Sequence, residues 1–198
     1  MKKLYALLGM MALALSLTGC DNAENSPQTF ATVDITGGTR GKDFRLTDHH
    51  GQERTVVDFK GKAVLLFFGF THCPDVCPTT MTRLAAAMEK LGKDAERVQV
   101  LMVTLDPKRD TPELLKTYVP AFHPSFLGLS GTEEQIEAVT KEFKVMRAVQ
   151  KPDENGYYTV GHSGGIYAFD PQGRLRLFIS DEHGPDVIAK DLKTLLES

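Results

Sequence analysis

The sequence predicts one α/β domain built around two parallel, fully buried strands. Residues 63–70 and 98–105 are almost continuously apolar, as expected for strands covered on both faces. Between them, apolar residues recur every three or four positions over residues 79–91, which indicates an amphipathic helix. A strand, a helix and a second strand in this order form a right-handed crossover, so the two strands are expected to be parallel.

A short hairpin is predicted ahead of the first buried strand. Residues 44–48 and 54–58 have strand-like patterns. They are separated by His49-His50-Gly51-Gln52, in which the glycine suits a tight turn. This hairpin would stand at the N-terminal edge of the domain.

Helix-start signals mark two further helices in the middle of the chain. In Asp110-Thr111-Pro112-Glu113, the aspartate or the threonine is the expected N-cap and the proline stands in the first turn. This helix is expected to reach about residue 122, with Pro120 ending or bending it. Thr132-Glu133-Glu134-Gln135 has the pattern of a capping box. The helix after it should turn three apolar residues inward: Ile136, Val139 and Phe143.

The C-terminal part combines strands with a closing helix. Residues 157–160 are predicted to form a short strand, and residues 165–170 and 174–180 a hairpin across Pro171-Gln172-Gly173. Residues 185–197 have the apolar spacing of a helix. The order of all these elements is that of a single-domain thioredoxin-like fold with an N-terminal β-hairpin and insertions.

Two cysteines stand between the first buried strand and its helix. Cys73 and Cys77 lie in the run Phe70-Thr71-His72-Cys73-Pro74-Asp75-Val76-Cys77-Pro78, four positions apart. On a helix this spacing places both on one face, about one turn apart. A helix N-terminus also stabilises thiolates. The pair can therefore hold a soft metal ion or cycle between dithiol and disulfide.

The N-terminus has the features of an exported lipoprotein. Lys2 and Lys3 precede the apolar residues 4–17, a stretch too short to span a membrane permanently. Leu17-Thr18-Gly19-Cys20 resembles a bacterial lipoprotein cleavage box, which makes residues 1–19 the signal peptide and Cys20 the lipidation site. The alternative is an ordinary signal peptide with an incidental cysteine. Asp21 resembles a signal that retains lipoproteins at the inner membrane, so the expected location is the oxidising periplasmic side of that membrane.

Composition agrees with one domain held on a tether. Residues 20–40 are mostly polar and contain glycine, as in a flexible linker, and residues 41–198 are expected to form the domain. Loss of Lys2 and Lys3 with the signal peptide changes the formal net charge from −3 to −5. This acidity argues against a nucleic-acid partner, which would require basic clusters. A monomer is the default expectation.

Other roles for the cysteines and their neighbours are less favoured. A static disulfide would close a small loop and stabilise only modestly, so a bridge there is expected to be labile and functional. A closed zinc site normally has four protein ligands. His72, next to Cys73, is more suited to tuning the thiols than to binding such an ion. Met81 and Met88 share the apolar stripe of their helix and are expected in the core. Four histidines have no mutual spacing that suggests a site: His49, His50, His123 and His183.

Several segments in a fixed order carry a resemblance to known proteins. They are the cysteine run with Gly69 before it, Asp106-Pro107-Lys108-Arg109-Asp110-Thr111-Pro112-Glu113, Phe122-His123-Pro124, Gly128-Leu129-Ser130-Gly131, Gly161-His162-Ser163 and Ile166-Tyr167-Ala168-Phe169-Asp170. Together they resemble the Sco (SenC) family of thioredoxin-like, copper-binding proteins that assist assembly of cytochrome c oxidase. The resemblance extends from about Gly41 to the C-terminus.

The resemblance implies a copper site formed by Cys73, Cys77 and His162. An aspartate usually precedes this histidine in the family, whereas this chain has Gly161, and Gly164 and Gly165 follow after Ser163. Thiolates suit Cu(I), and imidazole suits either oxidation state of copper. An oxygen from Asp106 or from water could complete a Cu(II) site.

The resemblance implies a membrane-tethered metallochaperone that turns over no substrate in the enzymatic sense. Its expected partner is the dinuclear copper centre of cytochrome c oxidase or another periplasmic copper protein. The alternative is a thiol–disulfide oxidoreductase that keeps the copper-ligand cysteines of such a partner reduced. Simple thiol exchange would not need His162, and ordinary thioredoxin-like oxidoreductases have two residues between their cysteines instead of three.

Overall fold

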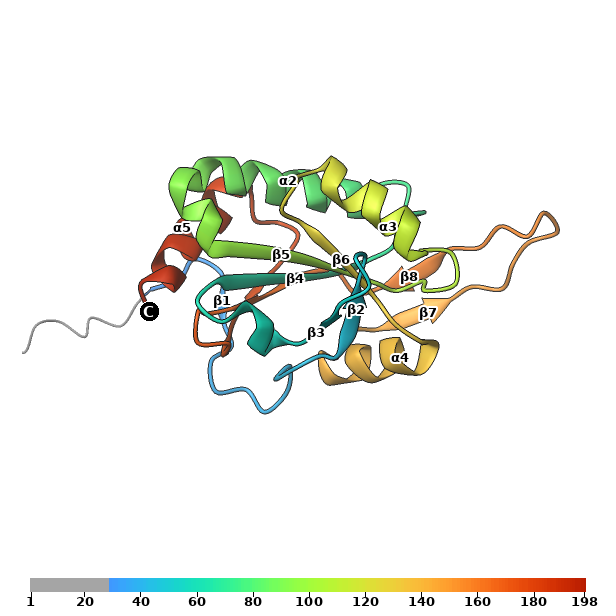
Figure 1. The fold of residues 1–198 in the computed structure, drawn as a ribbon, viewed down its shortest axis with the longest axis horizontal. Helices are drawn as coiled ribbons and strands as arrows, with labels where there is room; N and C mark the ends of the chain where they lie inside the picture. Colours follow the sequence, from blue (N-terminus) through green and yellow to red (C-terminus); the bar gives the residue numbers. More distant parts are fainter. Residues whose placement is uncertain (1–28) are drawn as a thin grey trace, which may run out of the picture.

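Two buried parallel strands form the centre of an eight-stranded sheet in the computed structural model, which describes residues 29–198 (Figure 1). Strands β4 (Ala63–Gly69) and β5 (Val98–Thr104) pair in parallel along their whole length. Every residue of both strands is buried, as their continuous apolar patterns require. The next strand, β6 (Leu127–Ser130), is also parallel to β5. The predicted parallel pair is therefore confirmed.

Antiparallel strands extend the sheet beyond β4. Strand β9 (Ile166–Phe169) pairs with β4, and β10 (Leu175–Ile179) pairs with β9, which confirms the predicted C-terminal hairpin. The outermost strand is β1 (Val33–Asp34), which pairs with β10. Since β1 lies within residues 20–40, the sheet begins earlier along the chain than the sequence predicts.

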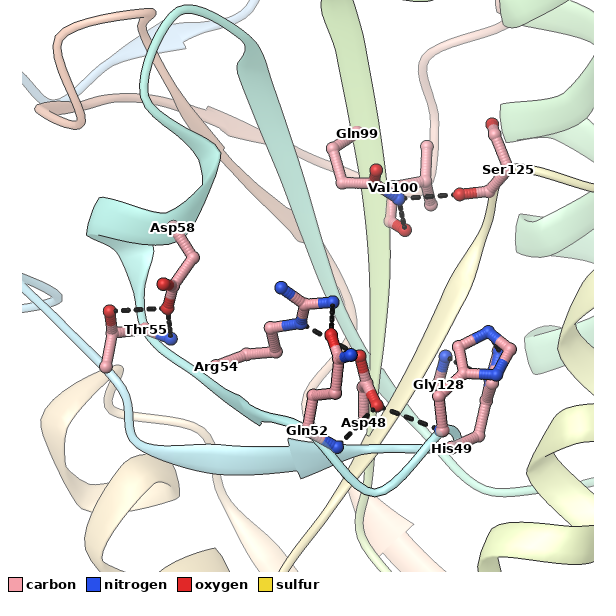
Figure 2. A network of polar contacts seen from close by, with 11 residues as sticks. Asp48, His49, Gln52, Arg54, Thr55, Asp58, Gln99, Val100, Ser125 and Gly128 are labelled. Atoms are coloured by element: carbon pink, nitrogen blue, oxygen red, sulfur yellow. Dashed lines mark hydrogen bonds and ion pairs between the residues drawn. The ribbon is translucent and has the colours of Figure 1, made fainter.

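The N-terminal hairpin is shorter than predicted. Strands β2 (Leu46–Asp48) and β3 (Glu53–Arg54) pair at the other end of the sheet. The last four residues expected in the second strand instead lead into a 3₁₀ helix (Val56–Phe59). The backbone N–H and the hydroxyl of Thr55 both donate to the Asp58 carboxylate, at 2.7 and 2.9 Å (Figure 2). This capping interaction turns the chain and ends the strand.

Helices cover both faces of the sheet. Helix α2 (Val76–Leu91) packs with α5 (Pro185–Leu196) on one side, and α4 (Glu133–Glu142) lies on the other (Figure 1). Helix α2 starts three residues earlier than predicted and so includes the second cysteine. Met81 and Met88 are at most 1% exposed, which confirms their place in the core. Within residues 29–198, no helix is long and apolar enough to cross a membrane.

The two middle helices begin at the predicted caps. Thr111 is the N-cap of α3 (Pro112–Tyr118), and its side chain accepts a hydrogen bond from the first turn. A 3₁₀ turn containing Pro120 follows, in the place where the sequence predicts an end or a bend. Thr132 begins α4 through the predicted capping box. The three residues expected to face inward from α4 are buried: Ile136, Val139 and Phe143.

A second, two-stranded sheet projects from the main one as an arm (Figure 1). It consists of β7 (Arg147–Val149) and β8 (Val160–His162). The sequence does not predict β7, and it places the second strand too early, at residues 157–160. The reason lies in Asp153, whose carboxylate accepts the backbone N–H groups of Asn155 and Tyr157 and so holds this segment in a turn.

Candidate metal centre

The two cysteines lie where β4 passes into α2. Cys77 is fully buried in the first turn of α2, and Cys73 is half-buried in the preceding loop. The backbone N–H of Cys77 donates to Sγ of Cys73 at 3.4 Å, and neither cysteine is in a disulfide. One thiol is therefore accessible while the other is enclosed by the core.

The environment of Cys77 favours its protonated form. Burial raises the pKa of the Cys77 thiol well above its usual range, and the nearby Cys73 and Asp110 raise it further. A hydrogen bond with the backbone of Phe70 acts in the opposite direction but is weaker than the effect of burial. A metal ion that binds this sulfur must displace its proton.

A buried carboxylate holds the base of the cysteine loop. Asp110 is 0% exposed and accepts hydrogen bonds from the backbone N–H and hydroxyl of Thr71, at 3.0 and 2.6 Å. It also accepts the hydroxyl of Thr104 at 2.6 Å, which ties the loop to the end of β5. His72 Nδ1 lies 3.0 Å from Oγ1 of Thr71 and 3.7 Å from the carboxylate. Sequence reasoning considered Asp110 only as a helix cap and missed this role, because no local pattern links the helix-start segment to the cysteine loop.

His162 comes to the cysteines from the end of β8. Its Nε2 atom lies 3.7 Å from Sγ of Cys77, and its Nδ1 atom lies 3.0 Å from the carbonyl oxygen of Ser163. Because a carbonyl only accepts, Nδ1 carries the proton of the neutral ring, and the lone pair of Nε2 faces the sulfur. The backbone of Ser163 thus orients the ring, and Gly161 directly before His162 contributes no side chain to it.

This separation suits two ligands of one ion. With metal–sulfur and metal–nitrogen bonds of about 2.3 and 2.0 Å, an angle of about 120° at the ion places the two donor atoms about 3.7 Å apart. Within the described part of the chain, no set of three or more His, Cys, Asp or Glu side chains is already grouped for an ion. The donor types of Cys73, Cys77 and His162 nevertheless fit copper, since they are two sulfurs and one imidazole.

Asp106 has other partners. Its two oxygens accept hydrogen bonds from Arg109 Nε at 2.5 Å and from the Tyr158 hydroxyl at 2.9 Å. The Arg109 guanidinium also stacks over the Tyr158 ring, 3.6 Å from its centroid. This carboxylate therefore fastens the arm to the main sheet, and water is the better candidate for an added oxygen ligand.

The other described histidines mostly have structural roles. His49, which lies beside Gly128 in Figure 2, accepts the backbone N–H of that glycine at Nδ1, at 3.0 Å. Its Nε2 atom lies 3.1 Å from His50 Nε2. Because Nδ1 of His49 accepts, its Nε2 atom carries the proton and donates a hydrogen bond to His50. The two imidazoles therefore do not both have a free lone pair with which to bind one metal ion. His123 bonds Ser125. His49 is 5% exposed, so the default expectation of a solvated or capping role for such a histidine is wrong for this residue.

Comparison with known proteins places the chain in one family. The family model SCO1/SenC matches residues 33–197. An SCO2-like protein of Rickettsia felis is 40% identical over 154 residues, which cover 77% of this chain and 75% of that protein. A mitochondrial SCO2 homologue of Danio rerio is 44% identical over 133 residues, which cover 66% of this chain and 48% of that protein. The chain thus spans about half the length of this mitochondrial relative.

Solved structures of the same family are also similar to this chain. The structure of Bradyrhizobium japonicum ScoI with copper bound has a TM-score of 0.72 and 39% sequence identity, and the match covers 78% of this chain and 98% of that one. A SCO1/SenC family lipoprotein from Bacillus anthracis has a TM-score of 0.62 and 32% identity, over 77% of this chain and 92% of that one. These likenesses confirm the predicted thioredoxin-like α/β fold.

Proposed function

The chain belongs to the SCO1/SenC family, and we propose that it is a copper metallochaperone whose cargo binds Cys73, Cys77 and His162. The observation that carries this proposal is the 3.7 Å approach of His162 Nε2 to Cys77 Sγ. Family members bind copper and take part in cytochrome c oxidase assembly. The same activity in this chain would deliver copper to the dinuclear copper centre of the oxidase.

The three ligands have separate tasks in such a carrier. Half-buried Cys73 meets the incoming ion first, and Cys77 loses its proton as the ion moves inward. His162 adds its Nε2 lone pair from a separate strand. With two thiolates and one imidazole, a Cu(I) ion has only three ligands. A ligand of the recipient can therefore bind the ion before the bonds to the carrier break.

Membrane attachment through lipidated Cys20 is part of the proposal, with the domain on the periplasmic side of the bacterial inner membrane. Cys20 and the signal peptide, residues 1–19, lie outside the described residues. The support is the sequence pattern and the lipoprotein among the structural relatives. The charge of the chain offers no reason to add a nucleic-acid partner, and we propose a monomer.

A second candidate function is thiol–disulfide exchange. The observation that favours it is the contrast between a half-buried Cys73 and a buried Cys77 in contact with it. Cys73 as thiolate would attack a disulfide of the recipient and form a mixed disulfide, releasing one recipient thiolate. Cys77 would then displace the second recipient thiolate, so that two electrons pass to the recipient and Cys73–Cys77 becomes a disulfide.

Anaerobic titration of the chain from Asp21 onward with Cu(I) tests the proposal. The wild type should bind one Cu(I) per chain, and Cys73→Ala and Cys77→Ala should each lose stoichiometric binding while circular dichroism shows an intact fold. Retention of one tightly bound copper by Cys73→Ala would refute the assigned site.

A further inference from the structure

A salt bridge joins α2 to the segment that follows β10. Arg83 of α2 lies with one guanidinium nitrogen 3.1 Å from the Asp181 carboxylate, and a second nitrogen donates to the Asp181 backbone carbonyl. The first nitrogen also donates to the hydroxyl of buried Thr80 at 3.2 Å. Arg83 therefore fixes both the side chain and the main chain of Asp181 relative to α2.

Asp181 in turn lies against the loop that follows the histidine ligand. A Cβ atom built on Gly164 would lie 2.0 Å from Oδ2 of Asp181. Gly165 has a φ of +112°, and a Cβ atom there would lie 2.3 Å from the Phe178 ring. This explains why two glycines stand after Ser163. At Gly165 the positive φ and the Phe178 ring exclude a side chain, whereas at Gly164 an added Cβ atom would have to displace the Asp181 carboxylate.

The same loop orients the imidazole. His162 Nδ1 donates to the carbonyl oxygen of Ser163, the residue directly before Gly164. Helix α2 carries Cys77 in its first turn and Arg83 further along. The contacts from Arg83 to Asp181 and from Asp181 to Gly164 thus connect the histidine loop to the helix that holds the sulfur facing it.

We propose that Arg83 and Asp181 are positioning residues for His162, and this inference rests on the copper site proposed above. They hold the loop so that Nε2 stays within ligand distance of Cys77 Sγ. When the pair is broken, the loop moves away from α2 and only the histidine arm of the site loosens. The cysteines keep their places, so the number of bound ions stays at one while the ion is held less tightly.

The positioning role of Arg83 and Asp181 predicts a larger effect on copper affinity than on the free energy of unfolding. The Asp181 side chain is 49% exposed, and exposed ion pairs contribute little to the free energy of unfolding. Groups that orient a metal ligand have a larger effect on the site, since their loss weakens metal binding by about 10- to 100-fold. Copper affinity and the state of His162 should therefore change far more than stability does.

Two substitutions and a matched control test the proposal. Arg83→Met removes the cation and keeps much of its apolar stem, and Asp181→Asn removes only the charge. Lys90→Met breaks another ion pair of α2, that of Lys90 in its last turn with Asp186 in the first turn of α5, at 2.7 Å. Should Arg83→Met not fold, Asp181→Asn provides the same test with a smaller change.

Two measurements are made on each variant. In the metal-free chain, the ¹⁵N signals of the His162 ring should show the Nδ1-protonated tautomer in wild type and in Lys90→Met, and a shift toward a mixture of tautomers in the other two. In competition with a Cu(I) chelator, Arg83→Met should bind one ion about tenfold more weakly than wild type, with Lys90→Met unchanged. Unaltered ring signals together with wild-type affinity in both positioning variants would overturn the proposal.

A double-mutant cycle gives an independent check. Gly164→Ala should weaken copper binding because the new methyl group displaces Asp181, and it should do so far less in an Asp181→Ala background. An equal loss of copper affinity on Gly164→Ala in the wild-type and Asp181→Ala backgrounds would contradict a contact between Gly164 and Asp181. If wild type binds no copper, the proposed function fails, but the ring signals of the metal-free chain still decide whether Arg83 and Asp181 position His162.

Discussion

Replacement of Asp110 by alanine should loosen the cysteine loop and destabilise the domain. The fully buried carboxylate accepts three hydrogen bonds: two from Thr71 at 3.0 and 2.6 Å and one from Thr104 at 2.6 Å. The two hydroxyls can rotate toward other acceptors, whereas the Thr71 backbone N–H cannot. A buried donor without a partner costs about 1–3 kcal/mol, and the two lost hydroxyl bonds add about 0.5–1.5 kcal/mol each.

The expected loss for Asp110→Ala is therefore about 2–6 kcal/mol in the free energy of unfolding, toward the lower end if the hydroxyls find other acceptors. Asp110→Asn keeps one acceptor oxygen and should lose less. Urea unfolding followed by circular dichroism, with thiols reduced, measures both variants through the midpoint and the slope of the transition. Asp94→Ala, which removes a half-exposed acid in an ion pair with the exposed Arg97, is the control and should stay within about 0.5 kcal/mol of wild type. A loss below about 1 kcal/mol for Asp110→Ala, with the slope unchanged, would refute the idea that this carboxylate holds the loop.

Two further predictions concern the buried imidazole of His49 and the closely packed backbone at Gly69. Burial, and secondarily His50, lowers the pKa of His49 below its usual value of about 6.5, so the unfolded chain gains a proton first as pH falls and the free energy of unfolding should decrease below about pH 6.5. His49→Gln should lessen that decrease between about pH 6.5 and 5, and an identical slope in unfolding titrations of both proteins would contradict the assignment. Gly69→Ala would place a methyl group 2.6 Å from the Phe67 ring and 3.0 Å from Cys77 Sγ, and should cost about 1–3 kcal/mol by urea unfolding. Gly184→Ala, whose new Cβ atom meets nothing within 4 Å beyond its chain neighbours, is its control. Equal stability of the two variants would show that the end of β4 accommodates a methyl group.

The central strands and the cysteine loop could be predicted from sequence because their signals are local. Continuous apolar runs define β4 and β5, and threonine caps define α3 and α4. The resemblance to a known family added His162, which no local pattern would have separated from an ordinary histidine at the end of a strand. The structure places its Nε2 atom 3.7 Å from Cys77 Sγ, and copper binding at this position stays a prediction.

The parts that sequence reasoning missed depend on contacts between distant segments. Strand β1 is only two residues long and is formed by its antiparallel pairing with β10. The Asp110 hydrogen bonds join residues 39 and 6 positions apart, and the contact of Asp181 with Gly164 joins two loops. Neither has a repeating pattern along the chain. The early end of β3 is different in kind, since the Thr55–Asp58 cap is a local signal that the strand-like pattern outweighed.

Copper binding and thiol exchange compete for the same two sulfurs. An ion on Cys73 and Cys77 prevents their oxidation, and a disulfide between them prevents metal binding. Burial of Cys77 bears on both, because its proton must leave before the sulfur can bind an ion or resolve a mixed disulfide. His162 distinguishes the two activities, since only the carrier uses its lone pair.

Copper affinity of wild type against His162→Ala is the most direct measurement of the central claim. Both chains, from Asp21 onward, are reduced, kept free of oxygen and titrated side by side against a Cu(I) competitor probe. One tightly bound copper per wild-type chain, weakened more than tenfold by the substitution, is the expected result for a site with two cysteines and His162. Weak binding, or binding that is indifferent to His162, would contradict the carrier site and favour dithiol reductase chemistry.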